Sequence, residues 1–243
     1  MAQLPSWRIV PRDTDDLPGW LCVDRLAGGS DAIVLAHPDV IAGGHVLMTL
    51  HLQGIVDACI LYWGPTMVSR RVEQAARAKQ MLSLRGDGCM EAFEAQRVSL
   101  EAIRDVVLQL LPVGNYDRIF AMTSDAIVLK RRVFMKVSTN IMDAVAILLQ
   151  EDPLGRARSV SDLWRITHRV KSGHQVEGGV IQPTMAMNIR RGDLVDVAAT
   201  VEVVMTRSKR GRQVELMFRP EEVVRLRSAR ELKVRYMNEV DGL

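Results

Sequence analysis

Few residues in this sequence have the types and the spacing that catalysis or metal binding requires. Ser161, Asp162 and His168 are the residue types of a hydrolytic triad, but they stand too close together, and no GxSxG turn presents a serine. His45 and His51 would share a metal only across a sharply bent strand, because six residues of strand span about 20 Å. We therefore predict no catalytic residue, no metal ion and no cofactor.

The hexapeptide SDAIVL occurs twice, at residues 30–35 and 124–129. The residues downstream of the two copies do not match, whereas a tandem repeat would keep its hydrophobic pattern. Three interpretations stay open: a duplication, a turn that leads into a buried strand, and two carboxylates, Asp31 and Asp125, that meet across a pseudo-twofold axis. We favour the turn and strand, because Ser and Asp side chains bond their own backbone and Ala-Ile-Val-Leu is typical of a buried strand.

Basic residues are concentrated in the last third of the chain. The net charge is only +3, but residues 1–155 hold 15 Lys and Arg against 18 Asp and Glu, and residues 156–243 hold 17 against 11. Such asymmetry indicates a polyanionic partner, for which RNA or single-stranded DNA fits best and an acidic lipid surface also fits. The predicted nucleic-acid-binding residues are Arg190, Arg191, Arg207, Lys209, Arg210, Arg212, Lys130, Arg131 and Arg132.

Aromatic residues make up only 5% of the chain, so base stacking cannot supply most of the affinity for nucleic acid. Binding is then electrostatic and independent of base sequence. A solvated basic face without any partner is the alternative.

The clearest element is a β-hairpin over residues 194–219 with a basic tip, TRSKRGR. Val195, Val197 and Ala199 alternate with Asp196, Ala198 and Thr200, and Gly211 suits a tight turn. Over about 40 residues the hairpin resembles part of a small OB-type barrel.

The remaining pattern predicts an α+β protein with two β-rich lobes and amphipathic helices between them, divided as residues 1–112 and 113–243. The expected strands are 20–24, 32–36, 45–52, 55–63, 118–122 and 126–137; the expected helices are 68–84, 99–111 with Ser99 as N-cap, 140–150 and a short one within 162–170; and 173–179 is expected to be a loop.

Composition places the chain among folded intracellular proteins. Of its 243 residues 48% are hydrophobic, no apolar run reaches the roughly 20 residues of a membrane span, and the amino terminus lacks a secretory signal pattern. A cytoplasmic location is expected. Three cysteines without CxxC spacing indicate neither a disulfide framework nor a zinc ribbon.

The function predicted from these features is non-catalytic. Thirteen methionines, few aromatics and apolar-faced strands are typical of a structural or assembly protein that associates with itself as a homo-oligomer and uses a basic C-terminal face for nucleic acid. A viral coat, matrix or movement-type role fits this profile. The alternatives are an enzyme whose site is assembled from dispersed residues and a protein-binding adaptor.

Overall fold

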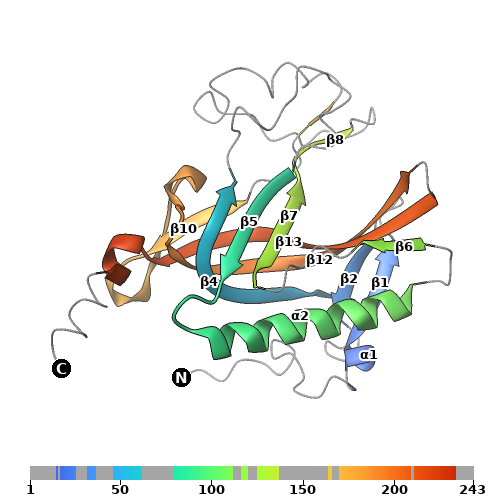
Figure 1. The fold of residues 1–243 in the computed structure, drawn as a ribbon. Coiled ribbons are helices and arrows are strands. Elements are labelled where there is room, and N and C mark those ends of the chain that lie inside the picture. The colour runs from blue at the N-terminus through green and yellow to red at the C-terminus, as the bar shows by residue number, and fades with distance from the viewer. Residues whose placement is uncertain are drawn as a thin grey trace.

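The computed structural model describes residues 15, 17–25, 32–36, 46–61, 79–111, 116–119, 125–136, 164–165, 170–208 and 211–233 (Figure 1). The helices are α1 (Leu17–Trp20), α2 (Met90–Leu110) and a short one at residues 229–233, with 3-10 turns at Glu177–Gly179 and Ala186–Asn188. The strands are β1 (Leu21–Arg25), β2 (Ala32–Ala36), β3 (Val46–Leu47), β4 (Thr49–Ile60), β5 (Lys79–Arg85), β6 (Tyr116–Ile119), β7 (Ile127–Arg132), β8 (Met135–Lys136), β9 (Trp164–Arg165), β10 (Lys171–Gln175), β11 (Ile181–Pro183), β12 (Leu194–Ser208) and β13 (Gly211–Arg227).

Most of the described strands join one sheet, which confirms the predicted α+β class. Its main order is β11-β10-β13-β12-β4-β5-β7, β1, β2, β3 and β6 join alongside, and β8 and β9 form a separate pair. The long strand β4 pairs with β12 through its first half and with β5 through its second half, with a bulge after Val56. Strands β4 and β5 fall in the expected lobe 1–112, and β12 falls in the expected lobe 113–243. Because β4 pairs with both β5 and β12, strands of the two expected lobes share one sheet.

The β12–β13 hairpin is confirmed and runs further than expected, to Arg227. Val195, Val197, Ala199, Val201 and Val203 are all fully buried, as the alternation predicts. Their neighbours across the hairpin include Phe218 and Leu216, so one face of the hairpin is a continuous apolar surface.

Helix α2 lies across this sheet (Figure 1) and buries Phe93, Leu100, Ile103 and Val107 against it. The predicted helix 99–111 is thus confirmed over its apolar stripe, but it begins nine residues earlier, at Met90. Ser99 is an interior residue whose hydroxyl donates to the Ala95 carbonyl at 2.9 Å, rather than an N-cap.

The predicted helix 68–84 is wrong where the structure describes it, because residues 79–84 belong to β5. Gln80, Leu82 and Leu84 are buried and alternate with more exposed residues, and β5 is bonded to β4 on one side and β7 on the other. Two neighbouring strands satisfy its backbone, so tertiary pairing overrides the helical spacing. Residues 68–78 lie outside the described part.

Three other local predictions agree with the structure only in part or lie outside the described residues. Helix 140–150 lies outside the described residues, and within 162–170 the described Trp164 and Arg165 form a strand instead of a helix. The expected loop 173–179 is strand β10 up to Gln175 and becomes a 3-10 turn only at Glu177. This strand contains a glycine at position 173 because Ile181 of β11 packs directly over it. A Cβ at residue 173 would lie 2.7 Å from Ile181 Cγ2.

Both copies of SDAIVL lead into strands with buried side chains. Ala32 and Val34 of β2 are fully buried, as is Ile127 of β7, and Asp125 lies in the turn before β7. Asp31 lies outside the described residues, so its distance from Asp125 is not defined. Among the described helices none is long and apolar enough to cross a bilayer.

Candidate nucleic-acid interface

The outward face of strands β5 and β7 gathers basic side chains. The antiparallel register places Lys79 opposite Arg132 and Met81 opposite Lys130, and directly opposed residues share a face. The intervening residues, including Leu82 and Leu129, are fully buried on the other face. Alternation with period two therefore presents Lys79, Lys130 and Arg132 together at one end of the two strands.

Glu215 of β13 links this cluster to the long hairpin. Its Oε2 lies 3.2 Å from Lys79 Nζ and its Oε1 lies 3.7 Å from Lys130 Nζ. The carboxylate is shared by two ammonium groups, so these three side chains sum to one positive charge, and the register places Arg132 beside Lys79. The cluster therefore has a positive surplus held on three strands.

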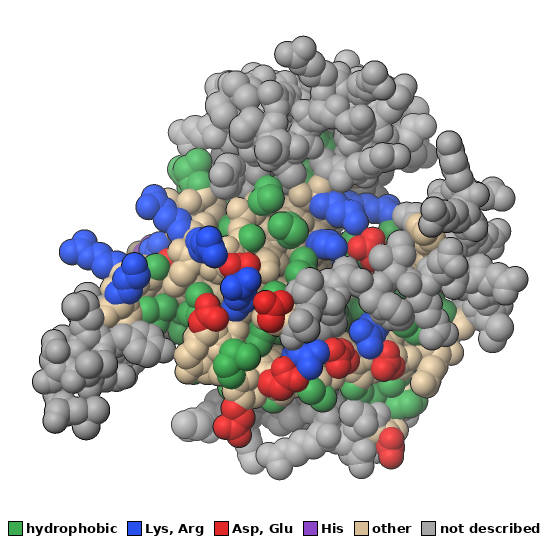
Figure 2. All heavy atoms as spheres, in the orientation of Figure 1, with side chains coloured by type: hydrophobic (Ala, Val, Ile, Leu, Met, Phe, Trp, Pro, Cys, Tyr) green, Lys and Arg blue, Asp and Glu red, His purple; other side chains and the backbone are tan. Residues whose placement is uncertain are grey.

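The hairpin tip lies next to this cluster. Arg212 is three residues before Glu215 on β13, a distance of about 10 Å along the strand, and Arg207 pairs with Arg212 across the hairpin. The side chains of Arg207 and Arg212 and the whole of Lys209 and Arg210 lie outside the described part of the molecule. Figure 2 shows Lys and Arg side chains gathered above α2, on the face that carries β5 and β7. The backbone at the base of the hairpin tip, about 80 residues from Lys130 in sequence, thus lies near Lys79 and Lys130.

Arg131 does not belong to this surface. It is 4% exposed, and its Nη1 donates to Glu221 Oε2 at 3.0 Å and to the Pro220 carbonyl at 3.2 Å. Burial lowers the pKa of the Arg131 guanidinium, and the adjacent Glu221 carboxylate opposes that shift. The sequence predicts a phosphate contact for Arg131, but the strand turns this side chain inward between its outward neighbours Lys130 and Arg132.

A charged network surrounds Arg131 beneath the outer face. Glu221 also accepts hydrogen bonds from Arg219 Nε at 2.7 Å and from the Thr200 hydroxyl at 3.0 Å, and Arg219 lies 3.8 Å from Glu202. Burial raises the pKa of Glu221, but Arg131, Arg219 and Thr200 outweigh it and hold that pKa below its usual value. The network joins β7 to β12 and β13 and fixes the strands that carry the outer cations.

Arg190 and Arg191 lie at the opposite end of the hairpin from its tip. Strand β12 begins just after them and is 15 residues long, so about 45 Å separates the two ends. Both side chains are exposed, and Arg191 Nη2 lies 3.2 Å from Asp57 Oδ1. The buried Asp193 holds this turn by accepting hydrogen bonds from the backbone N–H groups of Arg190 and Ala229. The residues predicted from sequence therefore divide between two ends of the molecule.

Acidic residues compensate the cations near Arg191. Asp57 also lies 3.5 Å from Arg85 Nε, and Asp125 lies 3.8 Å from Arg85 Nη2. The positive surplus on β5 and β7 is consequently at the Lys79 end and not at the Arg85 end.

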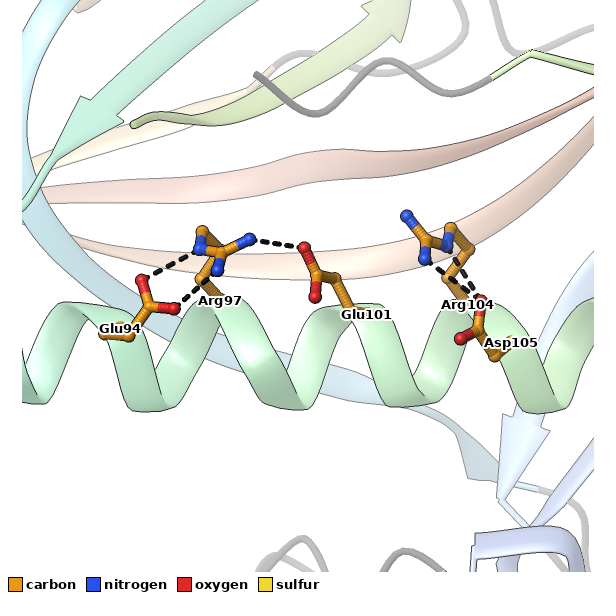
Figure 3. Close-up of polar contacts among 5 residues, drawn as sticks. All are labelled: Glu94, Arg97, Glu101, Arg104 and Asp105. Atoms are coloured by element: carbon orange, nitrogen blue, oxygen red, sulfur yellow. Dashed lines mark hydrogen bonds and ion pairs between the residues drawn. The ribbon is translucent and has the colours of Figure 1, made fainter. Parts of the chain in front are cut away.

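The cations of α2 are compensated as well (Figure 3). Arg97 contacts both Glu94 and Glu101, and Arg104 lies 3.0 Å from Asp105. The two pairs of Arg97 have the i,i+3 and i,i+4 spacings that stabilise an exposed helix face. The helix therefore adds no net positive charge through these residues.

Sequence reasoning missed Lys79 and Met81, because residues 68–84 were interpreted as a helix. The signal that identifies them is the alternation in KQMLSLR. Gln80, Leu82 and Leu84 form the buried set, so Lys79 and Met81 fall on the opposite face of the strand. Within the described residues no three His, Cys, Asp or Glu side chains come together in a way that would hold a metal ion.

Comparison with known proteins yields only distant likeness. No protein-family model matches the chain, and no curated protein matches it in sequence. Similar solved structures include a C-terminally truncated single-stranded DNA-binding protein from bacteriophage Enc34, with 9% identity, a TM-score of 0.34, and coverage of 86% of this chain and 95% of that one. Another is gp2.5, a single-stranded DNA-binding protein encoded by bacteriophage T7, with 9% identity, a TM-score of 0.34, and coverage of 75% and 87%. Likeness at this level transfers no residue and no activity to the present chain.

Proposed function

We propose that this protein binds single-stranded nucleic acid, without catalysis and without base specificity, through a basic strip. The strip consists of Lys79, Lys130 and Arg132 with Arg207, Lys209, Arg210 and Arg212 of the hairpin tip. The observation that carries the proposal is the position of Glu215, which contacts Lys79 and Lys130 from β13 and so brings the strip to the base of the hairpin tip. Cations held on paired strands suit a phosphate backbone, because the strands are already ordered before binding. Little binding free energy is then lost to ordering the chain.

The face between the cations favours a single strand over a duplex. Met81 and Val128 are half-buried apolar residues on the same side of β5 and β7 as Lys130. The unstacked bases of a single strand can pack against such side chains, whereas a duplex offers mainly phosphates and groove edges. Since no aromatic side chain lies on this face of β5 or β7, discrimination between bases is expected to be small.

The test is the salt dependence of binding to a labelled 20-nucleotide homopolymer. Replacing Lys130 and Arg132 with Gln removes two outward cations from half-buried positions, so the slope of log affinity against log salt should become shallower by about 1.4. The control replaces Arg97 and Arg104 of α2 with Gln, which changes the net charge equally at positions outside the strip. Its slope should stay near that of the natural protein.

Two results would contradict the proposal. One is no binding by the natural protein near 50 mM salt, where phosphate contacts are strongest. The other is an equal loss of slope in the two double variants, which would mean that only net charge matters. Equal or stronger binding of the corresponding duplex would refute the preference for a single strand.

A further inference from the structure

The end of the sheet remote from the hairpin tip carries exposed apolar side chains on and beside the edge strand β11. Val180, Ile181, Met185 and Met187 are between 44% and 60% exposed and lie within eight residues. In the described part of the chain β11 pairs with β10 alone, so its other side is open. Exposed apolar groups beside an unpaired strand edge are a template for pairing with another chain.

The backbone geometry shows which groups of β11 face outward. Thr184 N–H donates to Ser172 at 2.8 Å, and Val176 N–H donates to Val180 at 2.9 Å. In an antiparallel ladder the bonded pairs alternate, so the N–H and carbonyl of Ile181 point away from β10, as does the carbonyl of Pro183. Pro183 has no N–H, so the outward donor of this strand is at Ile181.

A second copy of the chain fits this edge. If two β11 strands run antiparallel about a twofold axis at Ile181, the N–H of each Ile181 donates to the carbonyl of the other, and both outward groups of Ile181 are satisfied. The side chains of Ile181 and Val180 are then covered on the two faces of the joined sheet.

Charge supports the same arrangement. Glu177 is exposed in the turn before β11, and Lys171 is exposed at the opposite end of β10, next to the end of β11. Antiparallel pairing brings the acidic end of one copy to the basic end of the other at both sides of the axis. A parallel arrangement would instead bring like charges together.

We propose that the protein forms a homodimer in which β11 pairs antiparallel with β11 of a second copy, centred on Ile181. This contact is independent of the basic strip, which lies at the other end of the long hairpin. The dimer therefore carries two strips, each remote from the joined edge.

Sedimentation velocity of the full chain at micromolar concentration tests the contact. The natural protein should sediment as a dimer, and Ile181→Lys should weaken dimerisation by about tenfold or more, because two like charges would meet on the axis. Ile181 is about half exposed, so the lysine stem can lie on the same surface without unfolding the strand. Val98→Lys on α2 is the matched control: it changes an equally exposed apolar residue and should leave the dimer intact.

A charge exchange gives a second, independent readout. Glu177→Lys alone should weaken the dimer, and adding Lys171→Glu to it should restore dimerisation. A monomeric natural protein, an unaffected Ile181→Lys dimer, or a double exchange that is weaker than the single variant would each overturn the proposal.

Discussion

Glu215 competes with the phosphate backbone for Lys79 and Lys130, so its neutralisation should strengthen nucleic-acid binding. The change Glu215→Gln keeps the size of the side chain and removes the charge that both ammonium groups contact at 3.2 and 3.7 Å. The strip then gains one unit of positive charge.

The size of the effect follows from Coulomb's law. A phosphate bound between the two lysines would lie about 6 Å from the Glu215 carboxylate, where two unit charges in water repel by about 0.7 kcal/mol. Removing that repulsion raises the affinity about threefold, and more where the site excludes water. The salt slope should steepen by at most about 0.7, which is one additional counterion for a single strand.

Fluorescence anisotropy with a labelled homopolymer, measured between about 50 and 200 mM salt, gives both the affinity and the slope. The control is Glu222→Gln, which makes the same change of charge seven residues further along β13. The two lysines lose a partner, so Glu215→Gln should also lower the free energy of unfolding by about 1 kcal/mol. The reasoning is refuted if the folded variant binds no more tightly than the natural protein, or if Glu222→Gln strengthens binding equally.

Two further predictions concern stability. Arg131→Met should lower the free energy of unfolding by about 2 kcal/mol in urea titrations. A buried carboxylate left without any partner would cost more, but Glu221 keeps its bonds to Arg219 and Thr200. Since the pKa of Glu221 is lowered in the folded state, its stabilisation is present above the ordinary glutamate pKa and is lost as pH falls through the lowered value. Without Arg131 the folded-state pKa is lowered less, so in Arg131→Met the loss should be smaller and should be complete at a higher pH. An unchanged acid profile would contradict the network. Gly86→Ala should cost about 1–3 kcal/mol in thermal unfolding, because its Cβ would lie 2.6 Å from Phe93 Cβ, whereas Gly19→Ala, which meets no atom within 4 Å, should leave stability nearly unchanged.

Local periodicity by itself determined two of the main elements. The alternating valines of β12 and the apolar stripe of α2 each predict one face and one partner surface, and both are buried as expected. These patterns can be recognised because apolar residues repeat every two positions in a half-buried strand and about every 3.6 positions in an amphipathic helix. Over a dozen or more residues the two repeats are clearly different. The basic tip of the hairpin and the excess of cations in the last third are likewise plain in the sequence.

Tertiary structure decided which cations share a surface. The run Lys130, Arg131 and Arg132 looks uniform in sequence, yet the pleat turns Arg131 into a buried network and leaves its neighbours outward. Lys79 joins them only because β5 pairs with β7, a contact across about 50 residues that no local pattern encodes. The length of β12 separates Arg190 and Arg191 from the hairpin tip. Strand pairing between distant segments depends on the whole set of competing partners, so it is fixed only when the sheet assembles.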